Sequence, residues 1–480
     1  MKIQIAPSAE RIHAMTKKTF GHTISQQIPR ILWILLLTGS LSAALAVAIR
    51  LFPDCSYAQP IRDAFISDTP QRSNSVLTDN TVTTKLDKPN GGTIYLKSRR
   101  AVSGLYLEWD IRPESWVITD RGRVVASSQQ GFVHEYVPLS CASTQLTLQW
   151  EGAAALCEVT PLTSGRRPGW VQCWQPPCSQ ADMLVISTHA DDELLWFGGT
   201  LPYYAGEKQY QVQVAYMINH FKKQPVRLHE LLNGLWSCGV RNYPIISSFD
   251  DVYTGSLQAA QQVYSQEDFI QFQVRLLRRF RPKVVIDQDL NGEYGHGAHQ
   301  MNARGLLKAL EYSCDSSYDP QSVQQYGIWN TPKAYLHLYP QNQICMQWSN
   351  RRLSSFGGKN ALQIAREAYR CHRSQRYVKF HVEESGPYDC RQFGLCRSTV
   401  GLDVHKDDFF ENIPTEWLST PTPAAPDGPG SYPDIPKPGW RHIRKRYLLA
   451  GLAIPGIFIL AILLWQLIAL KRKKRRTTHS

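Results

Sequence analysis

The chain has 480 residues, with 53 Lys and Arg against 40 Asp and Glu, and a formal net charge of +13. The positive charge lies at the two ends: the first 30 residues carry +4 and the last 40 carry +10, which leaves −1 for the chain between them. A nearly neutral centre offers no basic face to DNA or RNA, so we exclude a nucleic-acid partner. The length allows about two or three domains.

Each end of the chain carries an uncharged apolar run beside basic residues. Because a bilayer-spanning helix needs about 20 apolar residues, we predict transmembrane helices at 31–52 and 447–470 and the lipid bilayer as a partner. The positive-inside rule then makes 1–30 and 471–480 cytoplasmic and the centre extracytoplasmic. The small residues Ala46 and Ala48 leave open that the first span is a cleaved signal peptide, with a single C-terminal anchor remaining. Either alternative exports the centre.

Eleven cysteines fit an oxidising, exported setting, where disulfides persist. No CxxC pattern occurs, so we do not expect a zinc site built from cysteines. Proximity along the chain suggests three pairings, although sequence does not determine connectivity: Cys173 with Cys178, Cys390 with Cys396, and Cys141 with Cys157.

The segments between the two apolar runs differ in pattern. Residues 53–90 are polar and irregular and read as a spacer, whereas 91–165 alternate apolar and polar residues between turn signals, which predicts a small β-sandwich. Trp109 and Trp150 suggest carbohydrate binding, but they lie in phase with the buried face, which favours a core role. Residues 419–440 are proline-rich and predict a stiff stalk.

Residues 181–405 alternate strand and helix patterns. This alternation predicts a Rossmann-like α/β domain, with a mostly parallel sheet and helices on both faces. The predicted strands are 183–188, 212–218, 283–287 and 333–339, and the predicted helices begin near Asp192, Val226, Ser265, His299 and Asn360.

Two polar stretches follow predicted strands of this domain. Residues 183–199 read MLVISTHADDELLWFGG, and residues 283–299 read KVVIDQDLNGEYGHGAH. Ligands in open α/β sheets bind in the crevice outside the strand ends, so both stretches are expected at one site. His189, Asp192 and His299 are of the residue types that hold a catalytic zinc with an open fourth position. Asp191 remains free as general base, and His296 is placed for a protonated electrostatic or acid role.

HADDELLWFGG resembles the HPDDE signature of the PIG-L/LmbE family of zinc-dependent N-acetylglucosaminyl de-N-acetylases, and NGEYGHGAH resembles that family's GxYGHPDH segment. RLHELLNGLWSCGV at 227–240 is similar to the Arg and Glu helix of the family, and the resemblance covers about residues 181–400. The sequence departs from the family pattern at Ala190, which replaces a proline, and at Gly297 and Ala298, which replace Pro-Asp and remove a possible partner of the ligands.

The resemblance implies a role for each matching residue. His189, Asp192 and His299 would bind Zn²⁺, or Fe²⁺ or another divalent ion, and Asp191 would be the base. His296 would stabilise the oxyanion and protonate the leaving amine, Tyr294 would polarise the acetyl carbonyl, and Arg227 would hold the sugar conjugate. Glu193, Asp287 and Asp289 are expected to support the site, whereas His220 and His229 have no matching partners and are expected on the surface or in the core.

We therefore predict a membrane-anchored, extracytoplasmic, metal-dependent hydrolase of a carbon–nitrogen bond. Its expected substrate is an N-acetylated amino sugar, N-acetylglucosamine within a glycan, glycolipid or other conjugate. The alternative from another class is a non-catalytic glycan-binding surface protein that keeps a relic hydrolase fold. The predicted ligands and base are all retained, which argues against a relic because clustered charge is costly to bury.

Overall fold

The computed structural model describes residues 57–128 and 131–419. Among these residues, no helix is both long and apolar enough to cross a lipid bilayer. The predicted transmembrane helices at 31–52 and 447–470 lie outside the described residues, as do the terminal segments 1–30 and 471–480 and all but the first residue of the 419–440 stalk.

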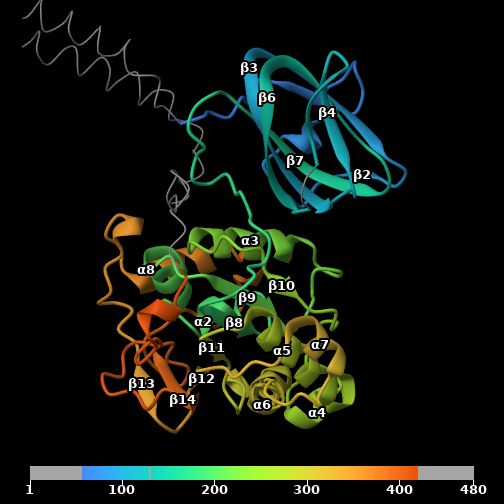
Figure 1. The fold of residues 1–480 in the computed structure, drawn as a ribbon. Helices are drawn as coiled ribbons and strands as arrows, with labels where there is room; N and C mark the ends of the chain where they lie inside the picture. Colours follow the sequence, from blue (N-terminus) through green and yellow to red (C-terminus); the bar gives the residue numbers. More distant parts are fainter. Residues whose placement is uncertain (1–56, 129–130, 420–480) are drawn as a thin grey trace, which may run out of the picture. The chain divides into compact units, whose positions relative to one another are not determined.

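The N-terminal part of the described chain is an all-antiparallel β structure (Figure 1). Its strands are β1 (Phe65–Ser67), β2 (Leu86–Lys88), β3 (Gly92–Ile111), β4 (Trp116–Asp120), β5 (Arg123–Ser127), β6 (His134–Trp150) and β7 (Ala154–Leu162). The order is β2-β7-β3-β6-β4-β5, and β1 pairs with β3. The prediction of an irregular spacer at 53–90 is wrong where β1 and β2 join this structure. β1 pairs with β3 and β2 pairs with β7. These distant partners cannot be recognised from the short polar segments alone.

Two long strands shape this domain. The pairing of β3 with β6 shifts register between Lys97 and Gly104, so each strand is divided into two halves. The first half of β3 also pairs with β1, and its second half pairs with β7. Trp109 on β3 and Trp150 on β6 meet edge to face with ring centroids 5.5 Å apart. They are 0% and 5% exposed, which confirms their predicted core role.

The second domain contains a seven-stranded sheet. Its strands are β8 (Met183–Ser187), β9 (Val212–Tyr216), β10 (Ile245–Ile246), β11 (Val284–Asp287), β12 (Lys333–His337), β13 (Gln343–Cys345) and β14 (Gln392–Ser398), in the order β10-β9-β8-β11-β12-β14-β13. The five strands from β10 to β12 are parallel, whereas β14 and β13 are antiparallel additions at one edge. The mostly parallel sheet is thus confirmed, and the sequence analysis missed β10, β13 and β14.

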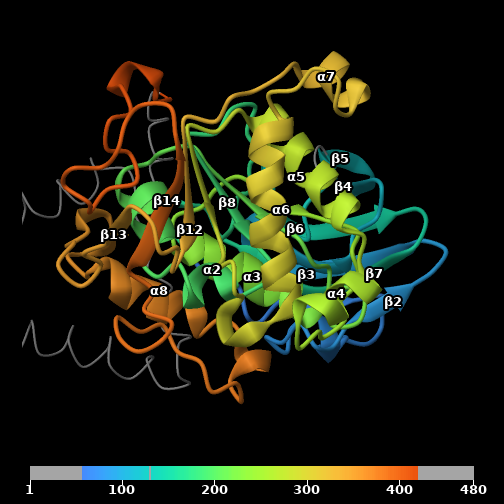
Figure 2. The ribbon, with the colours of Figure 1, turned by 90° about the horizontal axis from the view of Figure 1, so that it is seen from below.

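Helices cover both faces of this sheet, with α3 and α8 on one side and α4, α5 and α6 on the other (Figures 1 and 2). The helices are α2 (Asp192–Leu195), α3 (Val226–Ser237), α4 (Leu257–Val263), α5 (Gln266–Phe280), α6 (Gly297–Tyr312), α7 (Pro320–Tyr326) and α8 (Ala361–Tyr369). A π-helical turn spans Pro202–Glu207, and short 3-10 turns span Ser75–Leu77, Glu293–Gly295, Ser354–Phe356, Arg373–Gln375 and Thr415–Trp417. The five predicted helix starts are confirmed, whereas α4 and α7 were missed.

Alternate residues of β8 enter different cores. Met183 and Val185 pack in the core that contains α3 and α8, whereas Leu184 and Ile186 pack in the core that contains α5 and α6. Burial on both faces explains why this strand is a continuous apolar run rather than an alternating one.

The ten cysteines in the described ranges are all free. The three pairings expected from proximity along the chain are therefore wrong, because nearness in sequence does not bring the sulfur atoms into bonding geometry.

Glu158, on β7, is a buried carboxyl in the N-terminal antiparallel domain. Burial, followed by a hydrogen bond with Asp79, raises its pKa to about 8. Since the folded-state pKa lies above the unfolded one, ionisation favours unfolding, and stability falls as pH rises from about 4.5 through 8.

We expect Glu158→Gln to melt at the same temperature as the wild type near pH 4 and higher at pH 9, with a gain of about 1–3 kcal/mol there. Thermal unfolding of the full chain at both pH values measures this. Glu151→Gln, at an exposed position, is the control. Equal melting of the wild type and Glu158→Gln at pH 9 would contradict the assignment.

Candidate active site

The two motifs found in the sequence meet at one edge of the sheet. Parallel strands β8 and β11 are hydrogen-bonded neighbours, with Met183 opposite Val284 and Val185 opposite Ile286. Their carboxyl ends therefore lie side by side, and the polar residues that follow each strand enter the same crevice. The predicted convergence of these two segments is confirmed.

Three side chains meet at this edge with their polar atoms almost equidistant. His189 Nδ1 lies 3.0 Å from Asp192 Oδ2 and 3.0 Å from His299 Nε2, and the last two atoms are 3.1 Å apart. Ring nitrogens of His189, His296 and His299 also lie within 4.8 Å of one another. Two ligands of a tetrahedral zinc ion are about 3.3 Å apart, so the three atoms need only small shifts to hold a divalent ion.

The charge of the cluster also fits a cation. Burial alone would lower the pKa of His299, but Asp192 and Glu293 raise it to about 10. A positive charge is thus favoured between these carboxylates, and a metal ion would provide it in place of the proton. The donor set of imidazole and carboxylate is one that zinc and iron accept.

Glu293 contacts the ring nitrogen of His299 that faces away from Asp192. Its Oε2 is 2.8 Å from His299 Nδ1 and its Oε1 is 2.8 Å from His337 Nδ1. Burial alone would raise the pKa of Glu293, but the bonds from the two histidines lower it to about 2. Such an anion fixes the ring so that Nε2 is free to bind a metal. The sequence analysis missed Glu293 and His337, although Glu293 stands inside the NGEYGH motif.

Asp192 has a second anchor. Its other oxygen, Oδ1, accepts a hydrogen bond of 2.7 Å from Trp196 Nε1. This bond leaves Oδ2 for the histidines and orients the carboxylate toward them. Asp287, predicted to support the site, is fully buried and accepts from Asn302 Nδ2 at 2.7 Å.

Asp191 lies in a left-handed backbone conformation with a φ of 107° at the start of α2. Non-glycine residues held this way cost about 1–3 kcal/mol and cluster at functional sites. The backbone N–H of Asp191 donates to Glu193 Oε2 at 2.9 Å, which bears out the expected supporting role of Glu193. Burial raises the pKa of Asp191 to about 8. The negative charge of Asp192 also raises this pKa, whereas the positive charge of Arg227 lowers it.

His296 begins α6, and its Nδ1 accepts the backbone N–H of Ala298 at 3.2 Å. The pKa of His296 is lowered to about 2, mainly by burial and further by the positive charges of the neighbouring His189 and His299. The structure therefore favours a neutral ring with its proton on Nε2, not the protonated imidazolium expected from the sequence. A neutral ring can still donate one hydrogen bond from Nε2.

Tyr294 lies against this cluster. Its ring centroid is 5.6 Å from those of both His296 and His299, and it stacks on Phe380 at 4.7 Å. The residue has a positive φ of 48° and is 36% exposed, so its ring stands at the surface of the site.

Arg227, on α3, is buried and directed at the HADDE turn. Its Nη2 donates to the Ala190 carbonyl oxygen at 2.7 Å and lies 3.6 Å from Asp191 Oδ1. Arg227 thus holds the turn that carries Asp191, and its role in binding a sugar stays a prediction.

His220 has partners at the site that the sequence analysis did not find. Its Nε2 accepts the backbone N–H of Ala190 at 3.1 Å, and its Nδ1 is 3.5 Å from Asp251 Oδ2. No motif carries this histidine, because the segment that follows β9 reaches the site only in the folded sheet.

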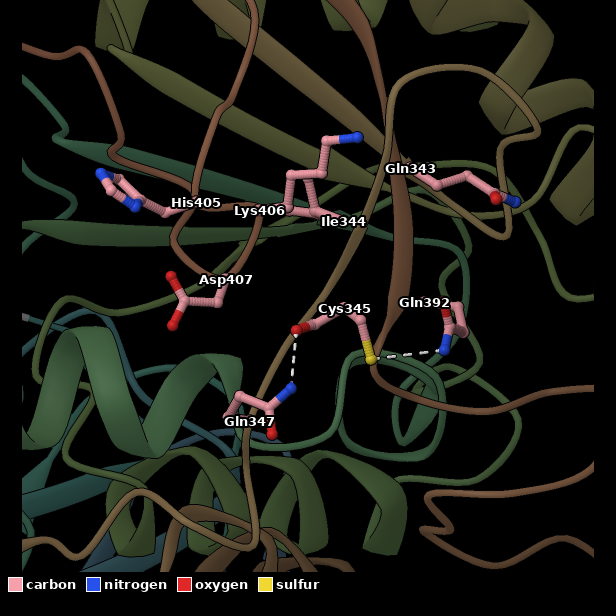
Figure 3. A pocket seen from close by; sticks show the side chains of 8 residues that line it. All are labelled: Gln343, Ile344, Cys345, Gln347, Gln392, His405, Lys406 and Asp407. Atoms are coloured by element: carbon pink, nitrogen blue, oxygen red, sulfur yellow. Dashed lines mark hydrogen bonds between the residues drawn. The ribbon is translucent and has the colours of Figure 1, made fainter.

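A different concavity lies at the antiparallel edge of the sheet (Figure 3). It is lined by Gln343, Ile344, Cys345, Gln347, Gln392, His405, Lys406 and Asp407. None of the predicted catalytic, substrate-binding or metal residues is among them, so we do not place the candidate active site there.

The fold and site define an α/β protein with a candidate metal site at its parallel strand ends. Residues 184–310 match the model of the family described as PIG-L: GlcNAc-PI de-N-acetylase. Over these residues the chain is similar to the PIG-L/LmbE family.

Two similar proteins carry the name of a deacetylase of an acetylated amino sugar. The 1D-myo-inositol 2-acetamido-2-deoxy-alpha-D-glucopyranoside deacetylase 1 of Catenulispora acidiphila is 22% identical over 193 residues, which cover 35% of this chain and 59% of the relative. The corresponding deacetylase of Streptomyces scabiei is 22% identical over 209 residues, covering 38% and 62%. The chain thus spans about three fifths of these relatives.

Solved structures are also similar in part. An N,N'-diacetylchitobiose deacetylase from Pyrococcus horikoshii aligns with a TM-score of 0.33 and 17% identity, covering 43% of this chain and 75% of the other. Teicoplanin deacetylase Orf2 aligns with a TM-score of 0.28 and 17% identity, and the alignment covers 43% of this chain and 88% of the other.

Gly297 explains one departure from the family pattern. Its N–H donates to the Thr254 carbonyl oxygen at 2.8 Å, and a Cβ added to it would lie 1.9 Å from Ser256 O. Proline has no N–H and has a side chain, so the family's proline does not fit here.

We expect Gly297→Ala to destabilise the fold by about 1–3 kcal/mol, because backbone atoms must move to admit the methyl group. Chemical denaturation of the full chain measures the loss. Gly255→Ala is the matched control, since a Cβ there would meet nothing closer than 3.9 Å. Equal stability of the two variants would contradict the close approach.

We expect Glu293→Gln to weaken zinc binding about 10- to 100-fold, because His299 loses the anion that orients it. Competition with a chromophoric chelator measures the affinity. Glu311→Gln, at an exposed position on α6, should bind zinc like the wild type. An unchanged affinity in Glu293→Gln would show that Glu293 does not support a metal ligand.

Proposed function

We propose that this chain is a metal-dependent de-N-acetylase that hydrolyses the acetamide of an N-acetylglucosamine-containing glycan, glycolipid or conjugate. One observation carries the proposal: ligand atoms of His189, Asp192 and His299 lie 3.0–3.1 Å apart beside the carboxyl group of Asp191. This cluster lies within the segment that matches the family model.

His189, Asp192 and His299 would hold the ion, with zinc as the first candidate and Fe²⁺ or another divalent ion as alternatives. When bound, such an ion acidifies water and polarises a carbonyl oxygen. The structure supports this assignment through the anchors on Asp192 and His299, which orient both side chains without help from an ion.

Asp191 would take a proton from the water molecule that attacks the acetyl carbon. The carbon–nitrogen bond then breaks, and the leaving amine needs a proton. Because His296 is favoured in its neutral form, we assign that proton to Asp191, which has just received one. The Nε2–H of His296 and the hydroxyl of Tyr294 would donate hydrogen bonds to the carbonyl oxygen as negative charge develops on it.

We also propose that the catalytic domain works outside the cytoplasm and is anchored to a membrane. Support comes from the two apolar runs of the sequence and the basic residues beside them. A membrane-anchored enzyme would reach a glycan or glycolipid substrate at the cell surface.

The experiment measures acetate release from a panel of N-acetylglucosamine conjugates by the purified full chain in detergent. We expect release by the wild type and a loss of at least about 100-fold in Asp191→Asn, since general-base catalysis contributes about 10²–10⁴-fold. His405→Gln, at an exposed position, is the control and should retain full activity.

A metal-loaded wild type that binds these glycans but releases no acetate would overturn the enzyme proposal and favour the glycan-binding alternative. Equal release by Asp191→Asn and the wild type would instead remove Asp191 from its assigned role.

A further inference from the structure

A second histidine cluster lies away from the candidate active site. It contains Glu108 on β3, His134 on β6 and His229 on α3, and one ligand atom of each lies within 4.8 Å of the others. His134 Nε2 is 2.7 Å from His229 Nδ1 and 3.6 Å from Glu108 Oε1. His134 and His229 are 0% and 1% exposed, so His229 is a core residue but one with polar partners.

The ring nitrogen of His134 that faces away from His229 is Nδ1, and it is a hydrogen-bond donor. His134 Nδ1 lies 2.7 Å from Gln172 Oε1. That oxygen also receives the indole N–H of Trp174 at 2.8 Å, and Gln172 Nε2 donates to Asn233 Oδ1 at 2.6 Å. Since an indole nitrogen only donates, the atom facing His134 is the amide oxygen, and His134 carries its proton on Nδ1.

The ring nitrogen of His229 that faces away from His134 is Nε2, and it is also a hydrogen-bond donor. His229 Nε2 lies 3.1 Å from Asp110 Oδ1, and Lys85 Nζ lies 2.8 Å from Asp110 Oδ2. A carboxylate paired with lysine is an acceptor, so His229 carries its proton on Nε2.

Two neutral rings bound in this way would turn lone pairs toward each other across 2.7 Å. The contact is favourable only when a positive charge lies between the nitrogens, as an extra proton or as a metal ion. Glu108 adds a carboxylate oxygen beside the same point. In metal-ligating histidines, one ring nitrogen binds the metal and the other donates a hydrogen bond to a carbonyl or carboxylate oxygen. His134 and His229 have this arrangement, because their donating nitrogens face away from each other and their other nitrogens converge.

The candidate active site has the same organisation. There, His189 Nδ1 and His299 Nε2 face each other at 3.0 Å, a carboxylate joins them, and Glu293 holds the outer nitrogen of His299. Both pairs lie closer than the roughly 3.3 Å expected around a tetrahedral zinc ion. In the second cluster the nitrogens must separate by roughly 0.6 Å, which small ring rotations allow.

Another grouping nearby is less suited to an ion. Asp110, Cys157 and His229 also have ligand atoms within 4.8 Å of one another. However, the ammonium group of Lys85 already pairs with Asp110 at 2.8 Å, so the charge of this carboxylate is already balanced. Asp110 is therefore better assigned as the support of His229.

We propose that Glu108, His134 and His229 form a second divalent-metal site, for zinc or a similar ion, that joins the β-sandwich to α3. Three protein ligands and one water molecule would complete a tetrahedral shell. The ion would fasten β3 and β6 to the helix whose residue Arg227 holds the HADDE turn. Its binding residues are distinct from those of the proposed active site, so the two proposals can fail separately.

The test is the zinc content of the full chain, measured by mass spectrometry after equilibration with free zinc and removal of excess. We expect two ions per chain in the wild type and in His405→Gln, and one ion in both His299→Ala and His134→Gln. His299→Ala leaves the second cluster intact, so its one ion reports on this cluster even if His134→Gln fails to fold. Adding Glu108→Gln to His299→Ala should weaken binding of that ion at least 10-fold.

One ion in the wild type and none in His299→Ala would overturn the second site and leave a shared proton between His134 and His229. One ion in both the wild type and His299→Ala would support the second site and contradict the metal assignment at the proposed active site. Binding to the double variant as tight as to His299→Ala would remove Glu108 from the site and overturn the proposed ligand set.

Discussion

The parallel pairing of β8 with β11 is the constraint on which the candidate site depends. It brings together two segments about 100 residues apart, each ending in polar groups that are costly to bury alone. The cost is offset because the groups satisfy one another. Asp192 contacts both His189 and His299, and the next layer of bonds, from Trp196 and Glu293, holds these side chains in place.

Strain and charge at the site have a common origin. The HADDE segment turns sharply from strand to helix, so Asp191 adopts a positive φ while its N–H is held by Glu193. Burial beside Asp192 raises the pKa of Asp191. The carboxylates also favour a positive charge near them, as the raised pKa of His299 shows. A site arranged in this way is already organised before substrate arrives, which is how protein groups stabilise developing charge most effectively.

The parts of the fold that were predictable are those with a strong local signal. Strands buried on both faces, such as β8 and β11, read as apolar runs, and helix starts such as Asn360 carry capping residues. The misses share a cause: β1, β2 and β14 are short or mixed strands defined by distant partners. At the site, Glu293 and His220 were missed as supports because their roles depend on contacts that only the assembled sheet creates.

We infer that the cluster of His189, Asp192 and His299 binds a catalytic metal ion. Anomalous diffraction at the zinc edge, from crystals of the zinc-loaded full chain, would locate such an ion. We expect a peak at about 2.0–2.2 Å from ligand atoms of His189, Asp192 and His299, with Asp191 beside it but not bound. A well-ordered cluster without an anomalous peak, with His299 hydrogen-bonded only to Asp192 and Glu293, would show that these residues do not bind zinc.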